Sequence, residues 1–359
     1  MSKPRSSLVV ALSLVFSAMA GDVAAATEAP RIGKPRPAPA GPSNLPPLPP
    51  AAIDNQLAIG GDDINATLKN TRMTVEVMVN GRGPYRFLVD SGADTSVVGL
   101  RIANELQLPL GKPAVLNGMT SRNIVDQVRV AELTLGKSTI RDLEVPALRE
   151  QDLGGEGMIG IDALVEQRLM MDFEKRIIKA EDASRPARMM DGEIVVTGRR
   201  RRGQLILTEV KASGLPLEAV IDTGSEVTIG NTALRDKLIR KGREKFVTVE
   251  VTGVTGVTVK LQMARVSQLQ LGTVILKDVP VAFADVPPFA VFGMANEPAL
   301  LIGTDLLETF RRVSLDFRRR KVRFQLRQCG LRYVSFSSAP SDYFSRIQSG
   351  ADGSVCKRT

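Results

Sequence analysis

The sequence predicts a mostly β protein made of two homologous halves. From about Thr71 to Leu326 the chain consists of short apolar runs separated by glycine and polar residues, a pattern typical of strands joined by tight turns. A series of landmarks in the first stretch then recurs in the same order in a second stretch, which indicates an internal duplication. Histidine is absent, so an active site must use other side chains.

The first half shows strand patterns divided by turn signals. Residues 73–79 alternate apolar and polar side chains, and Asn80-Gly81 is typical of a hairpin turn. Another strand is expected to begin at Phe87. Further strands are expected at 128–135, 143–148 and 176–179, and a short helix at 163–170.

The second half repeats these landmarks with longer loops. The corresponding segments are residues 205–210 and Ser213-Gly214 for the hairpin, 219–222 for the next strand, Leu271-Gly272 for a turn, 302–307, and 315–322. We therefore expect one domain at 71–180, a linker at 181–192, a second domain at 193–328, and a C-terminal tail at 329–359.

The N-terminal residues resemble a secretory signal. Lys3 and Arg5 precede an uncharged apolar run at 8–20, and small residues follow, so we expect a signal peptide at 1–26. An uncleaved anchor is the alternative, but the run is shorter than the ~20 residues that a bilayer requires. We expect a periplasmic or secreted protein without a stable membrane span. Residues 27–70 are rich in proline and alanine in their first part and predict a disordered tether.

The formal net charge of +9 raises the question of nucleic-acid binding. The basic residues cluster at 199–202 and 318–321 without interleaved aromatic residues, so we expect solvated loops and no nucleic-acid partner, with anionic lipid or cell-wall polymers left open. Cys329 and Cys356 are too few for a thiolate metal site, although an oxidising compartment would allow one disulfide. We expect no metal and no cofactor.

Each half contains one acidic turn directly after an apolar strand. The turns are Asp90-Ser91-Gly92 and Asp222-Thr223-Gly224. Either tripeptide alone fits any tight turn. A carboxylate at the end of a buried strand is disfavoured as an ion, and two brought together cannot both ionise readily, so one pKa rises and the other falls.

Such a pair can hydrolyse a peptide bond without histidine. The ionised carboxylate takes a proton from a bound water, while the protonated partner hydrogen-bonds the peptide carbonyl. The Ser91 and Thr223 hydroxyls are suited to bracing the two turns against each other. Gly92 and Gly224 permit tight backbone geometry and close approach of a substrate.

These motifs together resemble the retropepsin-like aspartic proteases. Residues 87–97 and 219–229 are similar to the active-site turn of that family. Met158-Ile159-Gly160 and Leu301-Ile302-Gly303 match its second motif, two hydrophobic residues and a glycine. The Gly-x-Asp-x-Leu form of 160–164 and 303–307 resembles the cellular and bacterial branch, here as an exported chain with two tandem domains.

The resemblance implies two acid-protease β-barrel domains related by a pseudo-twofold axis, each with a short helix. It also implies an aspartic endopeptidase acting on a peptide or protein substrate, with Asp90 and Asp222 as the catalytic pair. Asp94 and Glu226 match positions that contact the substrate backbone. Flap hairpins are expected near 117–120 and 252–256, which puts Met119 and Val254 against substrate. Ile161 and Thr304 stand where viral retropepsins place an arginine.

Three alternatives stay open at this level. The halves form one catalytic pair within a monomer, or each half pairs with its equivalent in a second chain; the short connection favours the first. The chain is a protease, or a catalytically silent peptide-binding module of the same fold. Residues 193–200 are the first strand of the second half, or a partner-binding segment similar to the TonB box of outer-membrane receptors.

Overall fold

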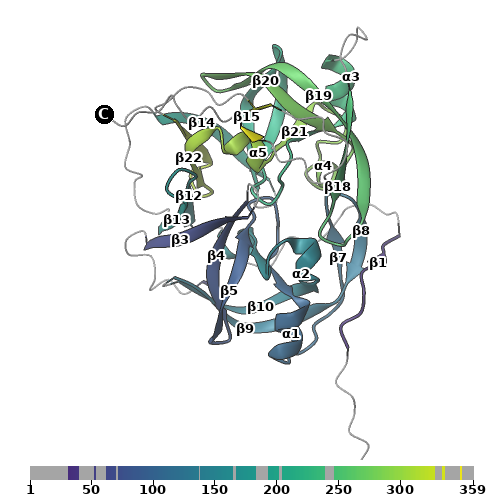
Figure 1. Ribbon diagram of the computed structural model, residues 1–359, viewed down its shortest axis with the longest axis vertical. Coiled ribbons are helices and arrows are strands. Elements are labelled where there is room, and N and C mark those ends of the chain that lie inside the picture. The colour runs from purple at the N-terminus through teal and green to yellow at the C-terminus, as the bar shows by residue number, and fades with distance from the viewer. Residues whose placement is uncertain are drawn as a thin grey trace, which may run out of the picture. The chain divides into compact units, whose positions relative to one another are not determined.

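The computed structural model describes residues 31–39, 52–53, 62–69, 72–136, 138–164, 167–182, 193–201, 204–238, 246–327, 334–335 and 348–349 (Figure 1). The predicted signal peptide, both cysteines and most of the linker and the C-terminal tail lie outside these ranges. Within them, no helix combines the length and the hydropathy needed to cross a membrane.

Strands dominate both halves, and the helices are short. The first half contains β1 (Arg36–Pro37), β2 (Ala52–Ile53), β3 (Asp62–Lys69), β4 (Arg72–Val79), β5 (Arg82–Val89), β6 (Val97–Gly99), α1 (Leu100–Glu105), β7 (Ala114–Asn117), β8 (Arg122–Val125), β9 (Gln127–Leu135), β10 (Ser138–Leu148), α2 (Glu150–Leu153), β11 (Gly157–Ile159), the 3₁₀ turn η2 (Ile161–Ala163), β12 (Gln167–Asp172) and β13 (Ile177–Asp182). The second half contains β14 (Glu193–Arg201), β15 (Gln204–Ala212), β16 (Leu215–Ile221), β17 (Ile229–Gly230), α3 (Thr232–Leu238), β18 (Val247–Thr252), β19 (Thr258–Leu271), β20 (Val274–Phe283), α4 (Pro287–Val291), β21 (Ala299–Ile302), α5 (Thr304–Leu307), β22 (Phe310–Asp316) and β23 (Lys321–Leu326). Beyond these, β24 (Val334–Ser335) pairs with β25 (Gln348–Ser349).

Each half closes a six-stranded barrel with the same connectivity. In the first, β4, β5, β11, β6, β10 and β9 pair in that order, and β9 returns to β4. In the second, β15, β16, β21, β17, β20 and β19 form the same circuit. The inward residues of these strands are buried and apolar, as the period-two pattern requires. The predicted mostly β fold with two homologous barrels is confirmed.

A third sheet joins the two barrels. Its strands pair antiparallel in the order β3, β13, β12, β22, β23 and β14, so each half supplies three neighbouring strands (Figure 1). The centre of this sheet is the pairing of β12 with β22, in which Met170 lies opposite Ser314. The two halves are therefore related by a pseudo-twofold axis through this pairing.

Two reciprocal ion pairs flank the centre of this joining sheet. Arg168 Nε lies 3.1 Å from Asp316 Oδ2, and Arg312 Nε lies 2.6 Å from Asp172 Oδ2. The two aspartates are each 2% exposed, and Arg168 is 4% exposed. Because each pair links one half to the other in nearly dry surroundings, both belong to the structural core of the joining sheet.

The N-terminal boundary of the first domain differs from the sequence expectation. Residues 62–69, expected in a disordered tether, form β3, which pairs with β4 and with β13. Residues 36–37 form β1 on the outer edge of β8, where Ala38 N donates to Arg122 O at 3.0 Å. Both segments form the edge of a sheet. The composition of residues 27–70 gave no sign of these edge strands, so the sequence did not predict them.

Two local expectations also change. The helix expected at 163–170 is absent among the described residues; η2 occupies 161–163, and β12 begins at Gln167 because its apolar residues pair with β22 in the joining sheet. Equivalent short helices, α1 and α3, instead follow β6 and β17 in the two halves. Phe87 does not begin a strand but lies near the end of β5.

Residues 193–200 lie in β14, as the simpler interpretation of this segment predicts. Glu193–Thr197 pair with β23, and Gly198–Arg201 pair with β15. The strand thus connects the joining sheet to the second barrel.

Candidate active site

The two acidic turns occupy equivalent places at the ends of β5 and β16. In the first half, β11 pairs with both β5 and β6, and Asp90 N donates to Ile159 O at 2.9 Å. In the second, β21 pairs with both β16 and β17, and Asp222 N donates to Ile302 O at 2.9 Å. The two hydrophobic-hydrophobic-glycine motifs therefore hold the backbone of the two aspartates.

The hydroxyl residues of the turns bind each other across the pseudo-twofold axis. Thr223 Oγ1 donates to Val89 O at 2.7 Å and accepts from Ser91 N at 2.9 Å. Ser91 Oγ donates to Ile221 O at 2.9 Å and accepts from Thr223 N at 3.2 Å. This buried network joins the two turns within one chain, as the sequence predicts for Ser91 and Thr223.

Each carboxylate is held by its own turn and faces the glycine of the other. Asp90 Oδ1 accepts from Gly92 N at 2.7 Å and Ala93 N at 3.0 Å. Asp222 Oδ1 accepts from Gly224 N and Ser225 N, both at 3.0 Å. A Cβ added to Gly92 would lie 2.5 Å from Asp222 Cγ, and one added to Gly224 would overlap the Asp90 carboxylate. The glycines therefore let the two carboxyl groups approach each other.

Burial raises the pKa of both aspartates. Asp90 and Asp222 are 8% and 7% exposed, and loss of hydration is the main cause in each. The pKa of Asp222 rises further because of the neighbouring Asp90 carboxylate. Turn amides oppose the rise at both aspartates, and the Arg72 guanidinium opposes it further at Asp90, whereas the pKa of Asp222 is raised well above its ordinary value. The expectation that one of the two pKa values falls is therefore wrong, because the loss of hydration outweighs the turn hydrogen bonds at both carboxyl groups.

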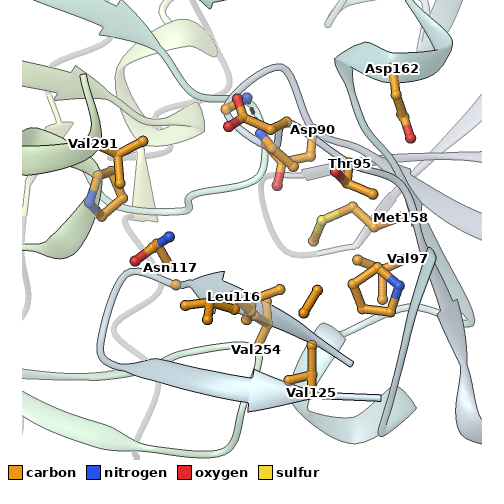
Figure 2. Close-up of a pocket in the computed structure, with 18 of the residues that line it drawn as sticks. Asp90, Thr95, Val97, Leu116, Asn117, Val125, Met158, Asp162, Val254 and Val291 are labelled. Atoms are coloured by element: carbon orange, nitrogen blue, oxygen red, sulfur yellow. Dashed lines mark hydrogen bonds between the residues drawn. The ribbon is translucent and has the colours of Figure 1, made fainter. Parts of the chain in front are cut away.

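The carboxyl pair borders a cavity of about 570 Å³ that is covered by two hairpins. The first is β7–β8 with its tip at 118–121, and the second is β18–β19 with its tip at 253–257. Ser121 Oγ and Thr255 Oγ1 share a hydrogen bond of 2.7 Å, so the tips touch. Figure 2 shows Asp90 on one side of the cavity and Leu116 and Val254, from the two hairpins, on the opposite side.

The hairpin tips cross over to the opposite halves. Val254 packs against an apolar cluster of the first half that includes Val97 and Met158, both of which line the cavity (Figure 2). Met119 packs against a cluster of the second half that includes Leu301. Both tip residues line the cavity, where the sequence analysis expected them, and each one packs against apolar residues of the other half.

The family model described as Aspartyl protease matches residues 75–163 and 208–306. The chain belongs to the aspartyl protease family. The two matched regions coincide with the two barrels, and they confirm the tandem retropepsin-like domains inferred from the motifs. No match was found among the curated proteins. Membership in the family supports a protease-like function.

The structure of this aspartyl protease separates the two acidic residues expected at the substrate backbone. Asp94 lines the cavity and accepts from Gln204 Nε2 at 3.2 Å. Glu226 is not among the lining residues and forms an ion pair with Arg72, with 3.0 Å between Oε1 and Nη2. Arg72 and Gln204 were not identified from the sequence, because each reaches a turn of the opposite half.

The aspartate two positions after the glycine of the second motif has a structural role that sequence reasoning also missed. Asp162 accepts from Ser96 N at 2.9 Å and from Ser96 Oγ at 2.7 Å. Asp305 accepts from Thr228 N at 2.9 Å and from Thr228 Oγ1 at 2.6 Å. These carboxylates hold the ends of the active-site loops, one residue after the positions where viral retropepsins place an arginine. The repeated Gly-x-Asp was the available signal.

Replacing Gly224 with alanine is expected to lower kcat/KM for peptide cleavage by about 100-fold or more. The new methyl group overlaps the Asp90 carboxylate and displaces one of the two facing carboxyl groups by a fraction of an ångström or more. Steady-state kinetics on Gly224→Ala, with circular dichroism to verify folding, measure this effect. An unchanged kcat/KM in a folded variant contradicts the described geometry.

Asp305 makes stability depend on pH. Burial raises its pKa from 3.8 to about 6, so the folded state retains this proton between those values while the unfolded state loses it. The associated stability is therefore present below about pH 4 and is lost as pH rises through 6, by about 3 kcal/mol in total. Between pH 4 and 7, urea unfolding should show that the free energy of unfolding falls by this amount in the wild type relative to Asp305→Asn. If the free energy of unfolding changed with pH in the same way in both proteins, the effect of Asp305 would be refuted. Asp236→Asn, which replaces an exposed aspartate on α3, is the control.

Proposed function

We propose that this chain is an aspartic endopeptidase in which Asp90 and Asp222 activate one water molecule within a single chain. The observation that supports this most directly is the hydrogen-bonded bracing of the two turns, with their carboxyl groups facing one another at the floor of a covered cavity. A peptide-binding module without activity has no need for two buried carboxyl groups whose pKa values are both raised.

The proposed reaction needs only these two carboxyl groups and water. The ionised carboxylate removes a proton from the water as its oxygen forms a bond to the peptide carbonyl carbon. The protonated carboxyl group donates its proton to the carbonyl oxygen, which gives a neutral tetrahedral intermediate. The C–N bond then breaks, the amine nitrogen receives the proton held by the first carboxyl group, and the second recovers its proton from the intermediate. Each carboxyl group ends in its starting state.

The proposed substrate is an extended segment of a protein with apolar side chains on both sides of the cleaved bond. The first half contributes Val97, Val125 and Met158 to the lining of the cavity, and the second half contributes Val291, Phe292 and Leu301. An extended segment fits between the flap hairpins and the floor, with its backbone facing Asp94. We propose that these substrates are in the periplasm or outside the cell, and the signal sequence expected at 1–26 supports this location.

The test is cleavage of an unfolded-protein library by the chain lacking residues 1–26, from pH 4 to 7. New termini are identified by mass spectrometry, and the reaction is run in H₂¹⁸O. The proposal predicts cleavage with one ¹⁸O atom in each new carboxyl group, without a covalent intermediate, and no cleavage by Asp90→Asn/Asp222→Asn. Saturable peptide binding without any new termini would reject the protease and favour the silent binding module.

A further inference from the structure

The two halves differ at one charged position beside the carboxyl pair. Arg72 is the first residue of β4, and Gln204 is the first residue of β15, the equivalent strand of the second barrel. Both side chains cross the pseudo-twofold axis to the acidic turn of the other half. The side chain that crosses from the first half is therefore a cation, and the one that crosses from the second half is a neutral amide.

The contacts of the two side chains are equivalent. Arg72 Nη1 donates to Gly224 O at 3.4 Å, and Arg72 Nη2 pairs with Glu226 at 3.0 Å. Gln204 Nε2 donates to Gly92 O at 3.0 Å and to Asp94 Oδ1 at 3.2 Å. Each side chain thus binds the turn glycine carbonyl and the acidic residue two positions later. The duplicated geometry has been kept while the charge has not.

The Arg72 guanidinium binds the glycine that faces the Asp90 carboxylate, and its ion pair with Glu226 offsets part of its charge. The Arg72 side chain is 13% exposed and also donates to Leu153 O at 3.2 Å, so its position is fixed. The titratable groups facing the pair are Arg72 on β4, Glu226 and Asp94 in the turns, and Asp162 and Asp305 behind them. Arg72 favours the charged form of Asp90, whereas the leading charge acting on Asp222 is that of Asp90 itself.

We propose that Arg72 is a positioning residue that divides the roles of the pair, with Asp90 as the ionised base and Asp222 as the protonated acid. This assignment rests on the proposed protease function. Without such a difference, two equivalent carboxyl groups would share one proton equally. In half of the molecules the proton would then be on the carboxyl group that has to act as the base for the bound peptide. A fixed guanidinium on one side gives a single arrangement before the substrate binds.

The pH profile of kcat/KM provides the first test. Arg72→Gln makes the two halves alike and is expected to move the acid limb about one unit toward higher pH, because Asp90 loses a favourable cation. Arg72→Lys retains the charge and should leave the limb near its wild-type position. Gln204→Arg, in a chain with Arg72 intact, adds a cation beside Asp222 and should move the basic limb to lower pH. An acid limb that does not move in Arg72→Gln, with kcat lowered equally at all pH values, overturns the proposal.

The internal duplication supplies a matched control in the exchange Arg72→Gln/Gln204→Arg. The guanidinium then sits at the equivalent site, with Asp94 in place of Glu226 as its partner. Carbon-13 NMR of labelled aspartate carboxyl groups, assigned with the two single Asn variants, reports which carboxyl group ionises first. The wild type should ionise Asp90 first and the exchanged variant Asp222 first. The same order in both proteins would overturn the proposal.

The NMR measurement needs no substrate, so it separates two kinds of failure. If the wild type cleaves nothing while the order of ionisation exchanges as expected, the protease function fails and the effect of Arg72 stands. If the wild type cleaves and the order does not exchange, the protease function stands and Arg72 has only a structural role.

Discussion

Asp90→Asn and Asp222→Asn are each expected to lower kcat/KM for peptide cleavage by about 10²- to 10⁴-fold. The amide keeps the shape of the carboxyl group and an oxygen that accepts from the turn N–H groups, but it cannot take a proton from water as a carboxylate does or pass a carboxyl proton to the substrate. Because one buried network braces both aspartates as a pair, substituting either one should be enough to cause this loss of kcat/KM. Steady-state kinetics on a cleavable peptide measure the effect, and Asp236→Asn is the control.

The same two variants distinguish the monomer from the homodimer. If each half instead paired with its equivalent in a second chain, Asp90→Asn would retain the activity of the second half and Asp222→Asn that of the first. A single catalytic pair within the chain predicts that both variants are inactive and that mixing them restores nothing. Activity retained by either variant, or recovered on mixing, would contradict the single-chain pair.

Arg168→Met is expected to lower the free energy of unfolding by about 3–5 kcal/mol. Removing the guanidinium leaves the Asp316 carboxylate, 2% exposed, without its partner across the joining sheet. Asp316 keeps the backbone N–H of Arg319 at 2.8 Å and the more distant Arg319 Nη1 at 3.5 Å, which compensate for only part of the loss. Urea unfolding at pH 7 measures the change. It should be larger than that of Arg312→Met, because Arg312 is 17% exposed against 4% for Arg168.

The double variant Arg168→Met/Asp316→Leu tests the cause of this loss. If the loss of the Arg168 guanidinium beside the buried Asp316 carboxylate is what destabilises the single variant, replacing that carboxylate with an apolar residue should recover most of the lost free energy. Equal destabilisation in the single and double variants would show that side-chain packing, rather than the buried charge, dominates at this position.

Local sequence patterns were sufficient for the barrels and for the centre of the site. The hairpin at Asn80-Gly81 forms because both residues adopt positive φ, at 50° and 72°, as the dipeptide predicts. The flap hairpins and the two Asp-hydroxyl-Gly turns are likewise short-range features. The helix expected at 163–170 failed because pairing with β22 outweighed the local preference of an apolar run that fits either a helix or a strand.

The sequence by itself determined the duplication, the two acidic turns and the absence of any imidazole chemistry, because each depends on residue identity and order alone. Only the tertiary structure decided that residues 62–69 complete the joining sheet, since a polar edge strand has no distinctive local pattern. It also decided that Arg72 and Gln204 serve the turns of opposite halves. Arg72 and Glu226 lie far apart in the chain, so no local pattern predicts their ion pair. The contact forms only when the two halves pack together around the pseudo-twofold axis.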